Sequence, residues 1–186
     1  MSASVGLIGL DMQVLSRELV ASDYFAGVEF VAIKRRLLDG AISISDLDFL
    51  FDHLNDLVGE DRLKDFGLEV FYGAYTRKHC SHLAQMLAYY SQGFTWDGKE
   101  TLRHEGPNYL LTKSEAQNVM KWFDTLSRIF CKMGIADDDF VKRAVYIRDN
   151  FGKDYDTFSE TDELFTPLVE RLAAAKVDMF LWFYSF

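Results

Sequence analysis

Cysteine and proline are both scarce in this sequence, which contains 2 of each among 186 residues. Two cysteines cannot form the framework of bridges that holds small secreted domains together, and so few suit a reducing compartment better. With so little proline, long helices are tolerated almost everywhere along the chain. We therefore expect a cytoplasmic protein whose stability comes from its hydrophobic core.

Long apolar runs are missing as well. The longest, Met179 to Tyr184, is far shorter than the ~20 residues that cross a bilayer. The first ten residues lack the charged leading region and the small-residue cleavage site of a signal peptide. The net charge is −9 and the basic residues are scattered, whereas binding to phosphate groups requires clustered Lys and Arg. We expect neither a membrane nor a nucleic acid as a direct partner.

Apolar residues are abundant and spread along the whole chain. They make up 49% of the residues, and aromatic residues make up 15%. Such a composition excludes a disordered chain. The length lies within the usual range for one domain and is short for two. The sequence therefore predicts a single globular domain over residues 1–186.

Helical spacing and capping signals dominate the pattern. In the helix expected from Tyr24, the residues with core spacing are Phe25, Val28, Val31, Ala32 and Leu38. Ser45, followed by Asp48 three residues later, is expected to begin the next helix. Together these signals predict a mainly α fold, a compact bundle of six to seven helices, with an all-α fold as the alternative. The helices are expected over residues 11–21, 24–38, 45–58, 62–91, 112–132, 137–150 and 159–176, the last beginning at Ser159 or Thr161. The stretch 62–91 is either continuous or bent or broken near Gly67 or Gly73.

Two segments favour a small β element beside the helices. A hairpin is expected over residues 94–103, where β-prone residues flank the turn Asp97-Gly98. The terminal segment 177–186 is apolar on both faces of a strand, which is typical of a buried strand. We expect this terminal strand to pair with the hairpin and with the apolar segment 5–10, which is either a strand or a loose lead-in.

Motifs for chemistry are missing from the sequence. It contains no Gly-x-Ser-x-Gly elbow, no phosphate-binding Walker loop and no dinucleotide fingerprint. The acidic stretch 149–160 has the length of a calcium loop, but Phe151 and Lys153 occupy positions where oxygen ligands are required. The sequence therefore predicts no catalytic residue and no cofactor, and favours a protein that is not an enzyme.

Only one cluster carries residues of the kind that bind transition metals. His79 and His82 lie one turn apart on the predicted helix, so both imidazoles could reach one ion. Zinc requires three or four ligands, and no further ligand stands at a recognised spacing. A small metal-dependent enzyme that uses His79 and His82 remains an alternative.

Acidic residues are concentrated in two windows. Residues 46–65 contain seven acids and two bases, and residues 137–163 contain nine acids and four bases. Each window has a net charge of −5, and the rest of the chain is almost neutral. The negative charge of this protein is therefore a local property of two segments.

In the first window, four of the seven acids recur every four residues: Asp48, Asp52, Asp56 and Glu60. On a helix this spacing stacks them along one face, about 6 Å apart along the axis. Like charges at this spacing destabilise a helix by roughly 0.2–0.5 kcal/mol per pair. One interpretation is a solvated face that aids solubility. The other is a docking surface for a basic protein. Its candidate residues are Asp48, Asp52, Asp56, Glu60, Asp137, Asp138, Asp139, Asp154 and Asp156.

The sequence thus favours a non-enzymatic module that sequesters or inhibits a basic protein. Bacterial immunity proteins and phage-encoded inhibitors have this size and charge and lack catalytic motifs. A structural subunit of an oligomer is a further alternative, in which the aromatic terminal segment or one helix face would be covered by another subunit.

Overall fold

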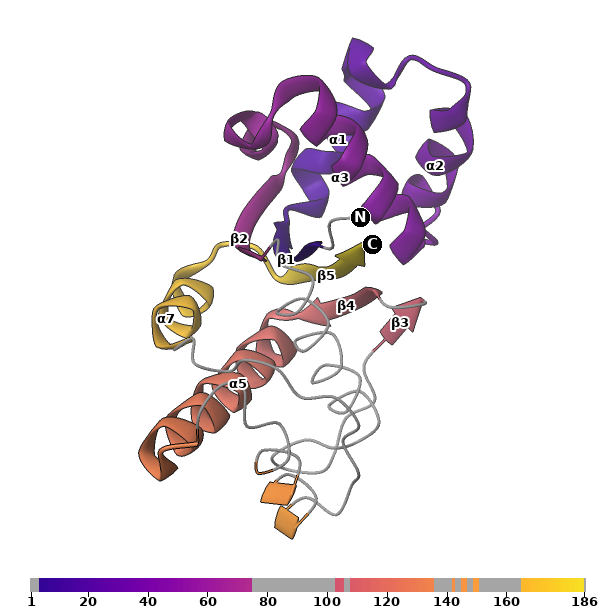
Figure 1. Cartoon of the computed structure of the whole chain (residues 1–186). Helices are drawn as coiled ribbons and strands as arrows, with labels where there is room; N and C mark the ends of the chain where they lie inside the picture. Colours follow the sequence, from indigo (N-terminus) through magenta and orange to yellow (C-terminus); the bar gives the residue numbers. More distant parts are fainter. Residues whose placement is uncertain are drawn as a thin grey trace.

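The computed structural model describes residues 4–74, 103–105, 108–135 and 165–185, with five further positions between 142 and 150. In these parts of the chain, one antiparallel sheet of five strands lies between helices (Figure 1). Its strand order is β2-β1-β5-β4-β3. The strands are β1 (Ser4–Leu10), β2 (Leu68–Ala74), β3 (Arg103–Glu105), β4 (Asn108–Thr112) and β5 (Met179–Ser185). The helices are α1 (Met12–Ala21), η1 (Asp23–Phe25), α2 (Glu29–Leu38), α3 (Ile44–Val58), η2 (Glu60–Phe66), α5 (Lys113–Met133) and α7 (Thr166–Ala174).

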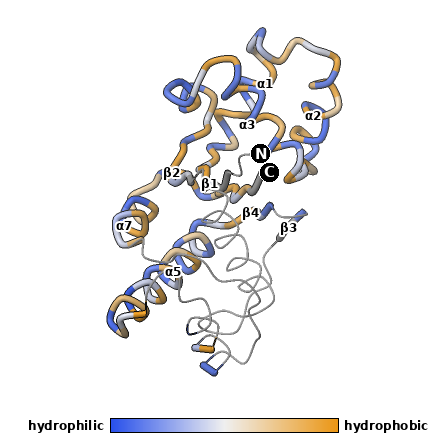
Figure 2. The backbone as a smooth tube through the Cα atoms, viewed as in Figure 1, coloured by the Kyte–Doolittle hydropathy of each residue, from blue (hydrophilic) through white to orange (hydrophobic). Residues whose placement is uncertain are grey.

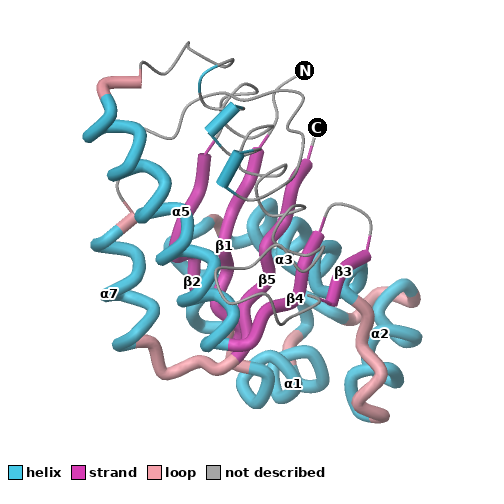
Figure 3. The backbone as a smooth tube through the Cα atoms, turned by 90° about the horizontal axis from the view of Figure 1, so that it is seen from below, coloured by secondary structure: helices cyan, strands magenta, loops and turns pink. Residues whose placement is uncertain are grey.

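Helices cover both faces of the sheet. The elements from α1 to η2, here called the N-terminal layer, lie on one face, and α5 and α7 lie on the other (Figures 1 and 3). Hydrophobic and hydrophilic residues alternate turn by turn along α5, as expected for a helix with one buried face (Figure 2). The core accordingly forms two apolar clusters, one on each side of the sheet.

Strand β5 lies in the middle of the sheet and contributes to both clusters. Phe180 and Trp182 are buried in the cluster beneath α5 and α7, and Leu181 is buried in the cluster of the N-terminal layer. The predicted buried terminal strand is therefore confirmed. Its predicted pairing with the first apolar segment is also confirmed, because β1 and β5 pair from Ser4↔Ser185 to Leu10↔Met179.

The predicted mainly α bundle is wrong, since the chain has an α+β fold. The main cause is residues 68–74, which were expected within the helical stretch 62–91, either continuous or broken near Gly67 or Gly73. A short helix, η2, ends at Gly67, whose φ of +80° suits glycine, and the β-prone segment that follows forms β2 beside β1. A register shift opposite Leu7 and Ile8 leaves Phe71 unpaired, so Phe71 and Tyr72 both contact the cluster beneath α5.

The predicted hairpin is only partly covered by the structure. Residues 94–102 lie outside the described parts of the chain. Arg103 begins β3, which pairs with β4 from Arg103↔Leu110 to Glu105↔Asn108. Strand β4, which lies outside the predicted hairpin, pairs with both β3 and β5 and is the neighbour of the terminal strand on this side.

Capping signals placed most helix ends correctly. Asp11 accepts hydrogen bonds from the first turn of α1, and Thr112 and Glu115 form the predicted capping box of α5. The start of α3 was misplaced by two residues, because Ser43 and Asp46 form its capping box instead of Ser45 and Asp48. Both pairs of residues have the spacing of a capping box. The pair Ser43 and Asp46 is favoured because Arg36, distant in the sequence, also binds the carboxylate of Asp46.

The predicted core face of the second helix is wrong except at Phe25, which is buried but lies before α2, in η1. Ala32 is exposed. Val28, Val31 and Leu38 are 87%, 60% and 68% exposed, while Phe30 and Ile33 are buried. The helix α2 carries apolar residues on two opposite faces, and the face with Phe30 packs inward because its aromatic ring buries more apolar area. In the described chain, no helix is both long and apolar enough to span a bilayer.

A truncation in β5 tests the two-sided burial. Replacing Phe180 with Ala should lower the free energy of unfolding by about 3–5 kcal/mol, because the side chain is fully buried and meets the Phe71 ring edge-on at 5.3 Å. Urea denaturation measures the change. Val20→Ala is the control, since Val20 is 58% exposed and its loss should change the free energy by less than about 0.5 kcal/mol. A Phe180→Ala variant as stable as this control would contradict a buried central strand.

Candidate functional site

Three of the seven acids of the first window, Asp48, Asp52 and Asp56, lie on the outer side of α3. The opposite side of this helix carries Leu47, Leu50 and Leu54, all buried in the cluster of the N-terminal layer. Because Asp48, Asp52 and Asp56 recur every four residues, they follow one another along the outer side. We call these three residues the acidic ridge. Glu60 lies beyond the end of α3, in η2, and is exposed.

Asp46 anchors α3 and is not part of the ridge. Arg36 at the end of α2 donates two hydrogen bonds to its carboxylate, from Nε at 2.8 Å and from Nη2. The backbone N–H of Ser43 donates a third, at 3.0 Å. The hydrogen bonds from Arg36 are the main reason that the pKa of Asp46 is lowered to about 2. The run of basic residues that ends α2 therefore includes a structural ion pair.

Asp48 links α3 to the sheet. Its Oδ2 accepts a hydrogen bond of 3.0 Å from the side-chain amide of Asn108, the first residue of β4. Partial burial raises its pKa, and the hydrogen bond from Asn108 acts in the opposite direction. One turn earlier, Ser45 donates from both N and Oγ to the carboxylate of Glu105 on β3. Asp48 thus has a structural role, because its hydrogen bond joins α3 to β4.

Asp52 and Asp56 are exposed and available for a partner. The pKa of Asp52 is raised, first by local desolvation and then by the charges of Asp48 and Asp56 on either side. Among the described residues, no ion pair joins Asp52 or Asp56 to a base. The repulsion along the ridge is therefore not relieved by any cation in the described part of the protein.

An exposed aromatic surface adjoins the ridge. Phe49 is 44% exposed and lies three residues before Asp52 and seven before Asp56, so all three share one side of α3. The imidazole of His53 stacks on Phe49 and lies 4.7 Å from the buried ring of Phe30, centroid to centroid. Its Nε2 donates to the carbonyl of Tyr24, at 3.1 Å. One face of the Phe49 ring is therefore directed towards His53, while the side chain remains partly open to solvent.

Most of the other predicted site residues lie outside the described parts of the chain. This applies to Asp137, Asp138, Asp139, Asp154 and Asp156 of the second acidic window, and to His79 and His82. The residues that the structure does describe contain no group of three His, Cys, Asp or Glu side chains arranged to hold a metal ion.

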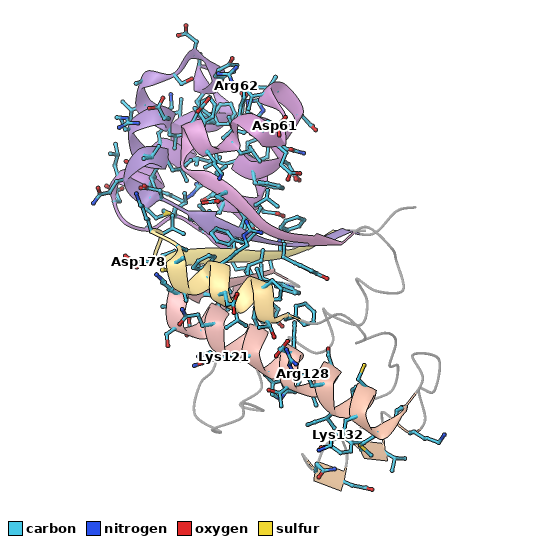
Figure 4. All side chains as sticks on the ribbon, turned by 90° about the vertical axis from the view of Figure 1, so that its left-hand side faces the viewer. Asp61, Arg62, Lys121, Arg128, Lys132 and Asp178 are labelled. Atoms are coloured by element: carbon cyan, nitrogen blue, oxygen red, sulfur yellow. The ribbon has the colours of Figure 1, made fainter. Side chains whose placement is uncertain are left out.

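Charge is distributed unequally between the two helical layers. Residues 4–74 contain 13 acids and 6 bases. The described residues of α5, α7 and the segments that flank them, 113–135 and 165–178, contain 4 acids and 6 bases. Figure 4 shows Asp61 and Arg62 on the N-terminal layer, and Lys121, Arg128 and Lys132 along α5 on the far side of the sheet. Among the described residues, the excess of negative charge therefore lies in residues 4–74 and not on the side of α5 and α7.

Two hollows in the described surface lack the features of a catalytic site. One, of about 350 Å³, lies between the start of α1 and the segment that precedes β5, and Asp11 and Asp178 line it. The carboxylate of Asp11 is used to cap α1. The other, of about 470 Å³, adjoins the end of α5, where Ile135, Val145 and Tyr146 are among the lining residues. Neither brings together a nucleophile and a base among the described residues.

Comparison with known protein families, with curated proteins and with solved structures found no match for this chain. The site must therefore be interpreted from its own geometry. Sequence reasoning found the ridge but missed Phe49, the exposed aromatic residue within it. The signal was present, since Phe49 stands at the i−3 and i−7 positions relative to Asp52 and Asp56, on the polar side of the helix.

The Arg36–Asp46 pair predicts a specific pH dependence. A lowered carboxyl pKa stabilises the folded protein above the ordinary value of 3.8, and this contribution is lost as the pH falls towards 2. Asp46→Asn should therefore cost about 1–2 kcal/mol of unfolding free energy at pH 7, the partial exposure of Arg36 reducing the effect. The difference from the wild type should shrink between pH 4 and pH 2. A constant difference across this range, measured by urea denaturation, would contradict the ion pair.

The opposite behaviour is expected at Asp52. Its raised pKa means that the folded protein is destabilised when the carboxylate is charged, and that this penalty is absent below the ordinary value of 3.8. Asp52→Asn should raise the free energy of unfolding by about 0.3–1 kcal/mol at pH 7, as two repulsive pairs are removed. The gain should vanish near pH 3. Asp52→Glu is the control, because it keeps the charge. Any increase in its free energy of unfolding is independent of the repulsion and should be the same at pH 7 and pH 3. A lower free energy of unfolding for Asp52→Asn at pH 7 would contradict the unrelieved repulsion.

Proposed function

We propose that the protein is a non-enzymatic binding module whose acidic ridge docks a basic protein and thereby sequesters or inhibits it. The observation that carries this proposal is the exposed pair Asp52 and Asp56, whose mutual repulsion is relieved by no cation in the described residues. A face that serves only solubility does not require like charges stacked one turn apart. Arrangements that reduce stability are typical of functional surfaces.

The chemistry of the ridge suits an arginine or lysine side chain of the partner. A cation placed between Asp52 and Asp56 meets two carboxylates, and the neighbouring ring of Phe49 offers its face to the same cation. Guanidinium groups stack on aromatic rings and bind carboxylates with two parallel hydrogen bonds, so arginine is the better fit. We infer that an arginine-rich surface of the partner is recognised.

The distribution of charge supports a defined direction of approach. The excess of acids in the N-terminal layer attracts a basic partner to the side of the sheet that carries the ridge, and such steering raises association rates. Cys131 is exposed and carries a free thiol, which agrees with a reducing compartment. We place the interaction in the cytoplasm.

The test is a comparison of two variants with the same change in charge. Asp52→Asn/Asp56→Asn removes the exposed part of the ridge and leaves Asp48 to bind Asn108. Glu18→Gln/Glu69→Gln removes two acids on α1 and β2, away from α3. Each protein is immobilised and used to capture host proteins, which are quantified by mass spectrometry, and the dissociation constant of each purified candidate is then measured against ionic strength.

A true partner should bind the wild type and the Glu18/Glu69 variant alike. Its dissociation constant for the Asp52/Asp56 variant should be at least about tenfold higher, equivalent to about 1.4 kcal/mol, and should depend less on salt. Because Asp52→Asn is expected to stabilise the fold, a loss of binding cannot be attributed to unfolding. A partner that binds both variants with unchanged affinity and unchanged salt dependence would contradict the proposal.

A further inference from the structure

The outer face of α2 is an apolar surface that nothing in the described structure covers. Val28, Val31 and Leu38 are 87%, 60% and 68% exposed. Their spacing of three and seven residues places them on one side of the helix, opposite the buried Phe30 and Ile33. Apolar side chains that are exposed singly are ordinary, but a row of three along one helix face is typical of an interaction surface.

The same face carries unpaired positive charge. Arg35 lies four residues after Val31 and three before Leu38, within the apolar row, and Lys34 lies beside it. Arg36 is paired with Asp46, whereas no ion pair among the described residues includes Lys34 or Arg35. The surface that covers this face should therefore combine apolar contacts with carboxylates.

The chain itself carries a surface of that composition. On the outer side of α3, Asp52 and Asp56 accompany the exposed side chains of Phe49 and Leu57, which are 44% and 52% exposed. The 15 residues of α3 extend over about 22 Å, and the 10 residues of α2 over about 15 Å, so the longer helix can accommodate the shorter. We propose that α2 of one copy packs on the acidic ridge of a second copy, with Lys34 and Arg35 facing Asp52 and Asp56.

The contact is expected to be weak. Each copy has a net charge of −9, and the resulting repulsion between copies is screened beyond about 8 Å at physiological ionic strength, where the pairs in direct contact still attract. Two short helices bury less surface than the roughly 1,200–2,000 Å² of stable complexes. We expect a dissociation constant between about 1 μM and 1 mM, measured by sedimentation velocity over a series of protein concentrations.

Charge reversal on each side of the contact provides the decisive experiment. One variant is Lys34→Glu/Arg35→Glu, and the other is Asp52→Lys/Asp56→Lys. Each alone should fail to associate, because α2 and the ridge then carry the same sign. An equimolar mixture should associate again, since acidic α2 meets basic α3 in one direction and the native pairing remains in the other. Both variants keep a negative net charge, so general attraction between them does not produce this result.

Substitutions of the apolar row provide an independent check. Val31→Ser/Leu38→Ser should raise the dissociation constant of the wild type at least tenfold, while Val20→Ser, at a position of equal exposure on α1, should leave it unchanged. Since these side chains are exposed, the variants should fold normally, and circular dichroism verifies this. The proposal is overturned if the wild type stays monomeric up to about 1 mM, or if both charge-reversed variants associate as the wild type does.

This inference goes beyond the proposed function, and the two can fail separately. The ridge is common to both, but α2 belongs only to the contact between copies. Lys34→Glu/Arg35→Glu should abolish self-association and leave the capture of a basic host protein unchanged or stronger, because the ridge is no longer occupied by a second copy. If this variant no longer captured the basic host protein, the proposal that α2 serves only in self-association would be overturned.

Discussion

The burial of β5 on both of its faces is the constraint on which the rest of the structure depends. A strand with Phe180 and Trp182 on one face and Leu181 on the other cannot lie at a surface, so helices must cover the sheet from both sides. The N-terminal helices cover one face, and α5 with α7 covers the other. The two clusters therefore meet across β5 and its two neighbours, since β1 and β4 also place Leu7 and Leu111 in one cluster and Ile8 and Leu110 in the other. Strands β1 and β4 pair with β5 directly, and β2 and β3 are joined to it through them.

This arrangement also places the candidate site. With Leu47, Leu50 and Leu54 of α3 buried on the side of the sheet, Asp52 and Asp56 must face solvent, whereas Asp48 is half-buried beside Asn108. Arg36 and Asp46 join α2 to α3, and Asn108 and Glu105 join α3 to β4 and β3. Asp52 and Asp56 are thus presented from a helix that is tied down near its start. A rigid support of this kind lets a docking surface keep its geometry without ordering cost on binding.

The two outward surfaces of the N-terminal layer carry charges of opposite sign, and both contain exposed apolar side chains. The ridge on α3 is acidic and adjoins Phe49, while the outer face of α2 is basic and carries Val31 and Leu38. The proposed docking of a basic partner and the proposed contact with α2 of another copy would use the same ridge. Competition between the two would keep the apolar surfaces covered when no partner is present, which reduces their tendency to aggregate.

Local signals in the sequence determined much of the fold. The caps at Asp11 and Thr112, the end of α5 at Gly134 and the two-faced apolar character of residues 179–185 depend on neighbouring residues, so they could be recognised without tertiary information. The stripe of acids on α3 was equally visible, because the helical period alone brings Asp48, Asp52 and Asp56 to one side. The separate roles of these acids were not visible in the sequence.

Tertiary contacts decided what the local pattern left open. Residues 68–74 form a strand because β1 offers an unpaired edge, and the apolar residues of α2 are divided between core and surface according to which face meets α3 and its neighbours. Asp48 became a structural link and Asp46 an ion-paired cap only because Asn108 and Arg36, distant in sequence, lie beside them. A sequence specifies which side chains share a face, whereas their partners depend on long-range pairing that periodicity does not encode.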